Sequence, residues 1–236
     1  MAFTEQKSLP LDRRLAGRIL AEKLTEYSGR KDVIVLALPR GGVSVGIGIA
    51  GQLRTPLAVI LVQKLVVPKQ SAAIGAVASG GLRYVNRALT RELGITDEDI
   101  ETAMHSAARE VLLREGFYNG GRNIPEMHDK VVVLADDGMI SGSTMYLACC
   151  AVRHAGAREV IVAVPIVSRA TSAKLAQVAD RVLSVVELQQ YEPLNGWYYA
   201  QRPTDRQAGT MVNQFIAQSN LDPAAAEDPQ QVPVHA

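Results

Sequence analysis

The chain has 236 residues, of which 47% are hydrophobic and 21% are charged, with 25 lysines and arginines against 24 acidic residues. A chain of this length can bury one large core, and its balanced charge gives no reason to expect a nucleic-acid or membrane partner. No apolar run reaches membrane-spanning length and the N-terminus has no signal-like apolar segment, so we expect a cytoplasmic protein.

Predicted strands and helices alternate along most of the chain. Apolar residues at helical spacing predict a first helix over residues 12–27, and runs of β-branched residues predict the strands. The predicted strands span residues 33–38, 57–62, 131–134, 160–165 and 182–187. The helices between them are predicted over residues 42–53, 96–115, 144–154 and 169–179. This alternation indicates an α/β fold, with a central, mostly parallel sheet flanked by helices on both faces.

Two further segments complete the organisation. Residues 74–78 and 82–85 read as a hairpin around Ser79-Gly80-Gly81. From residue 217 on, the sequence is rich in Ala, Pro, Gln and Asp and offers little to bury. We therefore expect one α/β domain over residues 1–216 and a disordered tail over residues 217–236.

The stretch "LADDGMISGST", residues 134–144, links a buried strand to a helix. In a parallel sheet ligands bind beyond the carboxyl ends of the strands, and the N–H groups at the start of a helix favour an anion such as phosphate. Carboxylates would repel a phosphate, so Asp136 and Asp137 make sense facing hydroxyls or a divalent cation. A phosphorylated sugar supplies phosphate and hydroxyls together. The alternative is an ordinary loop in which Ser143 or Thr144 caps the helix.

A second candidate loop follows the first predicted strand. It reads "LALPRGGVSVG", residues 36–46, and it lies in an interval between Asp32 and Glu92 that contains basic residues and no acidic residue. An anionic ligand would be favoured there. The spacing of glycines at residues 46, 48 and 51 fits the dinucleotide-binding pattern, but these glycines do not follow the strand directly and lack the acidic partner, so we assign them to close helix packing.

Both loops resemble the motifs of one family. "VVVLADDGMISGSTM", residues 131–145, resembles the motif with which type I phosphoribosyltransferases bind phosphoribosyl pyrophosphate (PRPP), and residues 36–46 resemble their diphosphate-binding loop. The resemblance extends from about residue 9 to residue 214, to a poorly characterised bacterial subgroup, through "QKLVVP", "AIGAVASGG", "FYNGGR" and "VAVPIVS". It implies the fold of that superfamily, with a small flap within residues 64–122 and a hood that includes residues 188–199.

The resemblance also implies roles for individual residues. Asp136 and Asp137 would hold the ribose hydroxyls and stabilise positive charge on the ribose during the reaction. The residues that would wrap the 5-phosphate are Gly138, Met139, Ile140, Ser141, Gly142, Ser143 and Thr144. Those that would contact diphosphate are Arg40, Gly41, Gly42 and Lys64, although Lys64 could equally be a surface lysine. Ser141 stands where threonine is usual, a change that keeps the hydroxyl.

The acceptor side is less defined. Trp197 and Tyr198 lie in the expected hood, in a chain with only 5% aromatic residues, and their rings could stack on a planar acceptor. Packing within the hood is the alternative, and it is favoured for Tyr199. The aromatic pair that the subgroup often carries near residues 193–195 is absent, so no particular base is indicated.

The resemblance implies an enzyme that transfers phosphoribose from PRPP to a nitrogenous, nucleobase-like acceptor and releases diphosphate. Mg²⁺ would be held mainly through the substrate, because it would bind diphosphate oxygens, ribose hydroxyls and water rather than a cage of protein ligands. The histidines and cysteines show no metal-ligand spacing, so we expect no zinc site. The alternative is a PRPP or nucleotide sensor that has lost catalysis, and a sugar-phosphate hydrolase ranks lower because no nucleophile is evident. We expect no nucleic-acid partner, since no helix-turn-helix or basic extension is present, and we expect a homodimer because superfamily members usually pair.

The hood assignment predicts that Trp197→Ala weakens binding of an acceptor more than binding of PRPP. The physical reason is that the indole ring would stack on the acceptor and not on the sugar phosphate. Separate calorimetric titrations with each ligand would measure the two effects. Equal losses for both ligands would contradict the hood assignment.

Overall fold

The computed structural model describes residues 11–67, 73–118, 120, 122, 124–139, 141–190 and 196–219. Its centre is a five-stranded sheet in the order β2-β1-β6-β7-β8, with every neighbouring pair parallel. The strands are β1 (Val33–Ala37), β2 (Leu57–Val59), β6 (Val131–Ala135), β7 (Glu159–Ser168) and β8 (Arg181–Leu188). The two central strands β1 and β6 pair from Val33↔Val131 to Ala37↔Ala135, so their carboxyl ends lie level. The expected parallel α/β sheet is confirmed.

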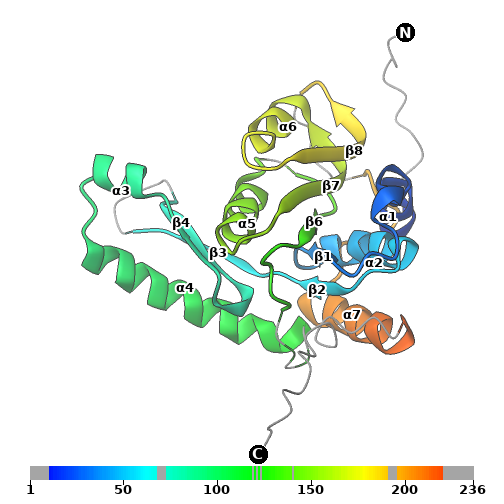
Figure 1. Ribbon diagram of the computed structural model, residues 1–236, viewed down its shortest axis with the longest axis horizontal. Helices are drawn as coiled ribbons and strands as arrows, with labels where there is room; N and C mark the ends of the chain where they lie inside the picture. The colour runs from blue at the N-terminus through cyan, green and yellow to red at the C-terminus, as the bar shows by residue number, and fades with distance from the viewer. Residues whose placement is uncertain are drawn as a thin grey trace, which may run out of the picture.

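Helices cover both faces of this sheet (Figure 1). One face is covered by α1 (Arg13–Ala21), α2 (Gly41–Leu53) and α7 (Asp205–Ser219), and the other by α5 (Ser143–His154) and α6 (Arg169–Leu175). All five residues of β1 and all five of β6 are buried, because each strand has helices on both sides. The continuous β-branched runs in the sequence reflect this two-sided burial. Among the described helices, none is long and apolar enough to cross a lipid bilayer.

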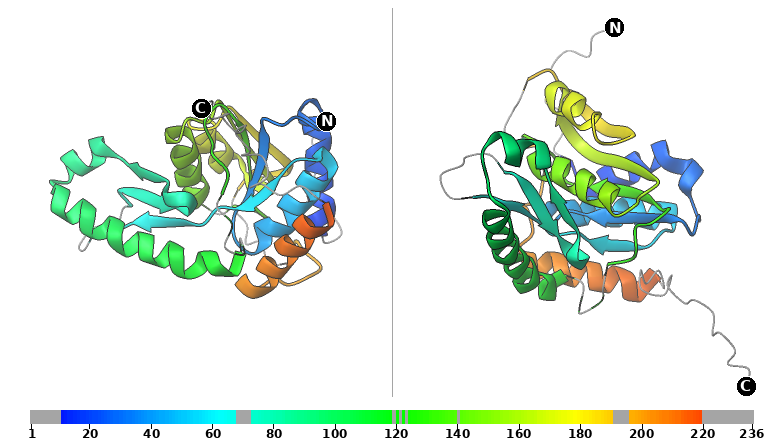
Figure 2. Two further views of the ribbon diagram at one scale, coloured as in Figure 1. Left: turned by 60° about the horizontal axis from the view of Figure 1, so that its bottom comes forward. Right: turned by 60° about the vertical axis from the view of Figure 1, so that its left-hand side comes forward.

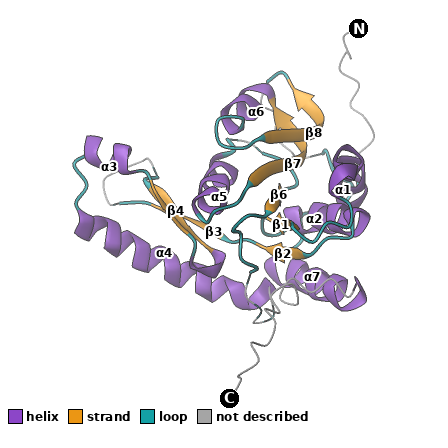
Figure 3. Cartoon of the chain, viewed as in Figure 1, coloured by secondary structure: helices purple, strands orange, loops and turns teal. Residues whose placement is uncertain are grey.

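A second, antiparallel sheet stands beside the first and forms a flap (Figures 1 and 2). Its strands are β3 (Val62–Leu65), β4 (Gly75–Ala78) and β5 (Arg83–Val85). It packs between α5 and the long helix α4 (Asp97–Tyr118), with the short helix α3 (Arg87–Glu92) at its far end. Figure 3 shows these strands and α4 extending away from the main sheet. The hairpin predicted at residues 74–85 is therefore confirmed, and it belongs to this flap sheet.

Several predicted boundaries were wrong. The strand predicted over residues 57–62 is two strands, β2 and β3, because the chain leaves the main sheet after Val59 and enters the flap sheet at Val62. The first helix ends at Ala21 and continues as a 3₁₀ helix, Glu22–Tyr27. The sequence reading missed α7 altogether, and this helix carries the chain to Ser219, past the predicted start of the tail. From residue 220 on, the expected tail lies outside the described residues.

Close helix packing was predicted for three glycines of α2, and the structure confirms it for Gly46 and Gly48. A Cβ atom added to Gly48 would lie 2.2 Å from the carbonyl oxygen of Arg14 in α1, and one on Gly46 would lie 2.9 Å from the Cβ of Ala37 in β1. Both distances are too short for real Cβ contacts. Gly51 differs, because its added Cβ would meet only Phe215 at an ordinary 3.5 Å. The first two glycines let α2 approach α1 and the sheet.

We predict that Gly48→Ala lowers the free energy of unfolding by about 2 kcal/mol, because the added methyl group forces α1 and α2 apart. Gly51→Ala is the matched control in the same helix. It should be neutral or stabilise by up to about 1 kcal/mol, since alanine has the higher helix propensity. Urea denaturation of both variants measures the difference. Equal effects at the two positions would contradict close packing at Gly48.

Candidate functional site

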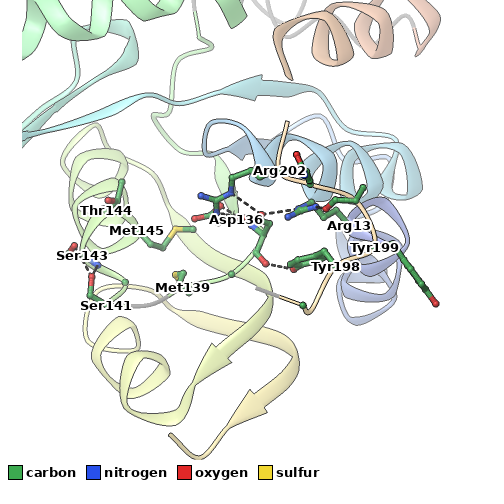
Figure 4. Close-up of a pocket in the computed structure, with 16 residues that line it drawn as sticks. Arg13, Asp136, Met139, Ser141, Ser143, Thr144, Met145, Tyr198, Tyr199 and Arg202 are labelled. Atoms are coloured by element: carbon green, nitrogen blue, oxygen red, sulfur yellow. Dashed lines mark hydrogen bonds and ion pairs between the residues drawn. The ribbon is translucent and has the colours of Figure 1, made fainter. Parts of the chain in front are cut away.

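An open pocket of about 720 Å³ lies beyond the carboxyl end of β6 (Figure 4). Four segments line it: the acidic turn (residues 136–137), the hydroxyl-rich turn (residues 138–144), the start of α1, and the segment at residues 196–204 that leads into α7, here called the α7 linker. The residues that line the pocket include Arg13, Asp136, Asp137, Ser141, Ser143, Tyr198, Tyr199 and Arg202. The pocket thus stands at the sheet edge where parallel α/β folds bind ligands.

The acidic turn holds two carboxylates in different surroundings. Asp137 is only 1% exposed, and its side chain accepts hydrogen bonds from Arg13 Nε at 2.9 Å and from Arg202 Nε at 3.1 Å and Nη2. Its backbone carbonyl accepts a hydrogen bond from the Tyr198 hydroxyl. Asp136 keeps partial exposure to the pocket, and its Oδ1 accepts the backbone N–H of Asp137 at 2.8 Å. One carboxylate is enclosed and the other faces the cavity.

These surroundings shift the two pKa values in opposite directions. Burial would raise the pKa of Asp137, but the hydrogen bonds and charges of Arg202 and Arg13 outweigh burial and lower it below its usual range. Burial and the adjacent charge of Asp137 raise the pKa of Asp136 well above its usual range. The ion pairs of Asp137 therefore stabilise the fold at neutral pH, and this contribution is lost as the pH falls through its lowered pKa.

The hydroxyl-rich turn shapes the start of α5. Gly142 is the N-cap, with φ at +63°, and it has no side chain to cap the first turn. The interpretation of Ser143 or Thr144 as a plain N-cap is therefore wrong. Ser141 Oγ lies 3.1 Å from Ser143 Oγ, and the first N–H groups of any α-helix have no partner within the helix. This start of α5 can accept an anion from the pocket side.

The Arg40 turn (residues 40–42) packs directly against the acidic turn. A Cβ added to Gly41 would lie 1.9 Å from Asp137 Oδ2, and one added to Gly42 would lie 2.9 Å from the carbonyl oxygen of Ala135. Only glycine fits at these positions. Arg40 itself has φ at +63° and ψ at −106°, a strained conformation for a residue with a side chain. A strained backbone of this kind persists only where the surrounding structure holds it, and it is common at functional sites.

One carboxylate at the start of α7 connects the Arg40 turn to helix α4. Asp205 accepts the hydroxyl of Tyr118 at the end of α4, and it pairs with Arg114 Nη2 at 3.5 Å. Its Oδ1 also lies 3.9 Å from Arg40 Nε. The Arg40 guanidinium is half exposed, so it remains accessible to a ligand while Asp205 orients it.

The structure brings most of the predicted site residues together. The acidic turn and the hydroxyl-rich turn line one pocket, and the Arg40 turn packs behind Asp137. Lys64 of β3 lies at the hydroxyl-rich turn, since its Nζ donates to Ser143 Oγ at 2.8 Å. Its contact with diphosphate stays a prediction. Ile140 lies outside the described residues.

Three aromatic residues of the expected hood have different surroundings. Tyr198 lies in the pocket wall with its ring stacked 4.0 Å from the guanidinium of Arg13. Tyr199 also lines the pocket, is 68% exposed and points away from the other labelled side chains (Figure 4). Trp197 is not among the pocket-lining residues, and its carbonyl accepts the N–H of Leu11 at 2.7 Å. Its stacking role stays a prediction.

Sequence reasoning missed two residues of the site, Arg13 and Arg202. They lie 124 and 65 positions from Asp137, outside both motifs, and no local pattern marks them. The signal in the sequence is physical: an aspartate within two residues of a buried strand needs a cationic partner from somewhere in the chain.

Comparisons with known proteins agree with this geometry. The family of phosphoribosyl transferase domains matches residues 10–197. The chain is 37% identical over 173 residues to "Putative phosphoribosyl transferase MT0597" and "Putative phosphoribosyl transferase Rv0571c" of Mycobacterium tuberculosis, strains CDC 1551 / Oshkosh and ATCC 25618 / H37Rv. Each match covers 73% of this chain and 39% of the relative, so the chain spans well under half the length of these curated relatives.

A solved structure shares the fold. The protein TT1426 from Thermus thermophilus is 30% identical, with a TM-score of 0.76 over 88% of this chain and 99% of that one. The family match covers most of the chain, and the matched span contains both turns that follow the central strands. The chain therefore belongs to the phosphoribosyl transferase family, within the type I phosphoribosyltransferase superfamily.

Proposed function

We propose that the protein transfers phosphoribose from PRPP to a nitrogenous, nucleobase-like acceptor and releases diphosphate. The observation that carries this proposal is the meeting of the acidic turn, the hydroxyl-rich turn and the Arg40 turn at the level carboxyl ends of β1 and β6. A sugar that bears a phosphate at one end and a diphosphate at the other needs these three kinds of partner at one place: hydroxyl acceptors, an anion-binding helix start and a cationic turn.

Each part of the site has a role in this reaction. The acceptor nitrogen forms a bond to the ribose C1, the C1–O bond to diphosphate breaks, and diphosphate leaves with the electron pair while the acceptor loses a proton. Residues 138–144 would hold the 5-phosphate, and Lys64 would add charge there through its place beside Ser143. Arg40, Gly41 and Gly42 would hold the diphosphate. The acidic turn would bind the ribose and stabilise its developing positive charge.

Mg²⁺ fits this site only together with the substrate. Within the described part of the chain, no three His, Cys, Asp or Glu side chains gather to hold a metal ion. Asp136, which faces the pocket, can offer one carboxylate, and diphosphate and ribose oxygens would supply the other ligands. When bound, the metal would neutralise charge on the departing diphosphate.

The alternative is a sensor that binds PRPP or a nucleotide without turnover. One observation favours it: Arg13 and Arg202 already occupy Asp137, which leaves Asp136 as the accessible carboxylate. A site of this kind can bind a ribose phosphate through its two turns and still lack catalysis. A single α/β domain over residues 1–216, a cytoplasmic location and a homodimer stay predictions from the sequence under either function.

We predict that the parent protein binds PRPP saturably in the presence of Mg²⁺, and that the double variant Asp136→Asn, Asp137→Asn binds it about 100-fold more weakly or not at all. The variant loses the Asp136 carboxylate that would contact the ribose and the Asp137 carboxylate that holds the acidic turn in place, and two losses of about 1.5 kcal/mol each give this factor. The control is Glu26→Gln, Asp32→Asn, which removes two carboxylates beside the amino ends of β1 and β8. Isothermal titration calorimetry measures all three proteins.

Diphosphate release during incubation with PRPP and a panel of nucleobases then separates the two functions. Release that depends on one base supports the transferase and identifies the acceptor. Tight PRPP binding with no release for any base supports the sensor. A folded parent protein that fails to bind PRPP would contradict the transferase and the PRPP sensor, and titration with nucleotides would then test the nucleotide sensor.

A further inference from the structure

The carboxylate of Asp137 is enclosed on every side that the structure describes. Arg13 reaches it from the start of α1 and Arg202 from the α7 linker, and together they donate three hydrogen bonds to its two oxygens (Figure 4). Gly41 lies against the same carboxylate, so closely that an added Cβ would overlap it. The side chain of Asp137 is 2% exposed. A ribose hydroxyl can reach this carboxylate only if an arginine leaves.

Asp136 is placed differently. Asp136 lines the pocket, and the residue as a whole is of intermediate exposure. Its Oδ1 accepts the backbone N–H of Asp137 at 2.8 Å, and its carboxyl group also interacts with the side chain of Asp137. Because a carboxylate has about four acceptor positions, Asp136 retains capacity for ribose hydroxyls or a metal ion.

The contacts around Asp137 also fix the segments that carry its partners. Asp12 caps α1 by accepting the N–H of Leu15 at 2.7 Å, which sets the position of Arg13 at the first turn. The Nη1 of Arg13 donates to the carbonyl of Ala200 at 2.7 Å, two residues before Arg202. The N-terminal helix and the α7 linker are thereby bound to each other and to one carboxylate.

We propose that Asp137 is a positioning residue, which Arg13 and Arg202 hold so that its backbone N–H orients Asp136 toward the ribose. This inference rests on the proposed function. It gives the two residues of the acidic turn different roles: Asp136 contacts the substrate, and Asp137 fixes the turn. Arg13, Arg202 and Tyr198 act through Asp137, although all three lie outside the family motif at residues 131–145. The binding geometry thus depends on two segments that the motif does not include.

A double-mutant cycle of Arg202→Gln and Asp137→Asn, measured as PRPP affinity by calorimetry with Mg²⁺, tests the proposal. If the pair acts as one unit, each single variant weakens binding about tenfold and the double variant is no weaker than the poorer single variant. If Asp137 itself binds the ribose, Arg202→Gln frees the carboxylate and leaves the affinity unchanged or higher, while Asp137→Asn loses affinity in both backgrounds. Either that pattern or simple additivity of the two losses would overturn the proposal.

The matched control is Arg153→Gln. Arg153 pairs with Asp180 through one amino group at 2.6 Å and is 39% exposed, close to the 42% of Arg202, but it lies outside the pocket described above. Its PRPP affinity should equal that of the parent. This control separates the loss of an ion pair as such from the loss of the pair at Asp137.

A second measurement needs no ligand. Amide hydrogen exchange of a peptide that covers residues 134–145 should rise at least tenfold in Arg13→Gln and in Arg202→Gln, and also in Tyr198→Phe, whose hydroxyl holds the Asp137 carbonyl. Tyr199→Phe is the control, because this side chain points away from the turn. Parent-like exchange in both arginine variants, with folding verified by circular dichroism, would overturn the positioning role. If the parent does not bind PRPP but the exchange rises, the proposed function fails and the positioning role of Asp137 stands.

Discussion

The burial of a single negative charge organises this site. Asp137 is the second residue after β6, a strand that is covered on both faces. Burying an ionised carboxylate at such a place costs free energy unless cations accompany it. Two arginines meet this requirement, and they come from opposite ends of the chain. Their contacts with one carboxylate join the start of α1 to the α7 linker at the pocket.

The same constraint explains why glycine lies behind the carboxylate. The Arg40 turn approaches Asp137 so closely that any side chain at residue 41 would collide with it. The strained backbone of Arg40 then follows, because the chain must leave β1, pass the carboxylate and begin α2 within three residues. Charge burial, the glycine pair and the backbone strain are therefore parts of one packing arrangement.

The sequence predicted the features that depend on neighbouring residues and missed those that depend on distant ones. The β-branched runs predicted β1, β6, β7 and β8, and the glycine and hydroxyl pattern predicted the turn before α5. The split between β2 and β3 was missed, because a continuous apolar run does not show which of two sheets its halves join. Helix α7 was missed because polar residues precede it and a compositionally biased tail follows it.

The interactions of the site show the same limit. Asp136 and Asp137 could be selected from their position after a strand, but their different surroundings could not, because these depend on Arg13 and Arg202. Likewise Lys64 was selected for its charge, while its position beside Ser143 follows from the way the flap sheet packs on α5. Sequence patterns identify candidate groups, and only tertiary packing decides which groups meet.

The contact between Lys64 and Ser143 has a thermodynamic consequence. It joins the flap sheet to the start of α5 through one ammonium group, so an anion bound at this turn would change the partners of a residue that belongs to the flap. Equilibrium linkage is reciprocal: the factor by which such an anion changes the preference of the flap for one position equals the factor by which that position changes the affinity for the anion. With an anion bound at this turn, the position of the flap and the affinity for the anion would share one coupling free energy.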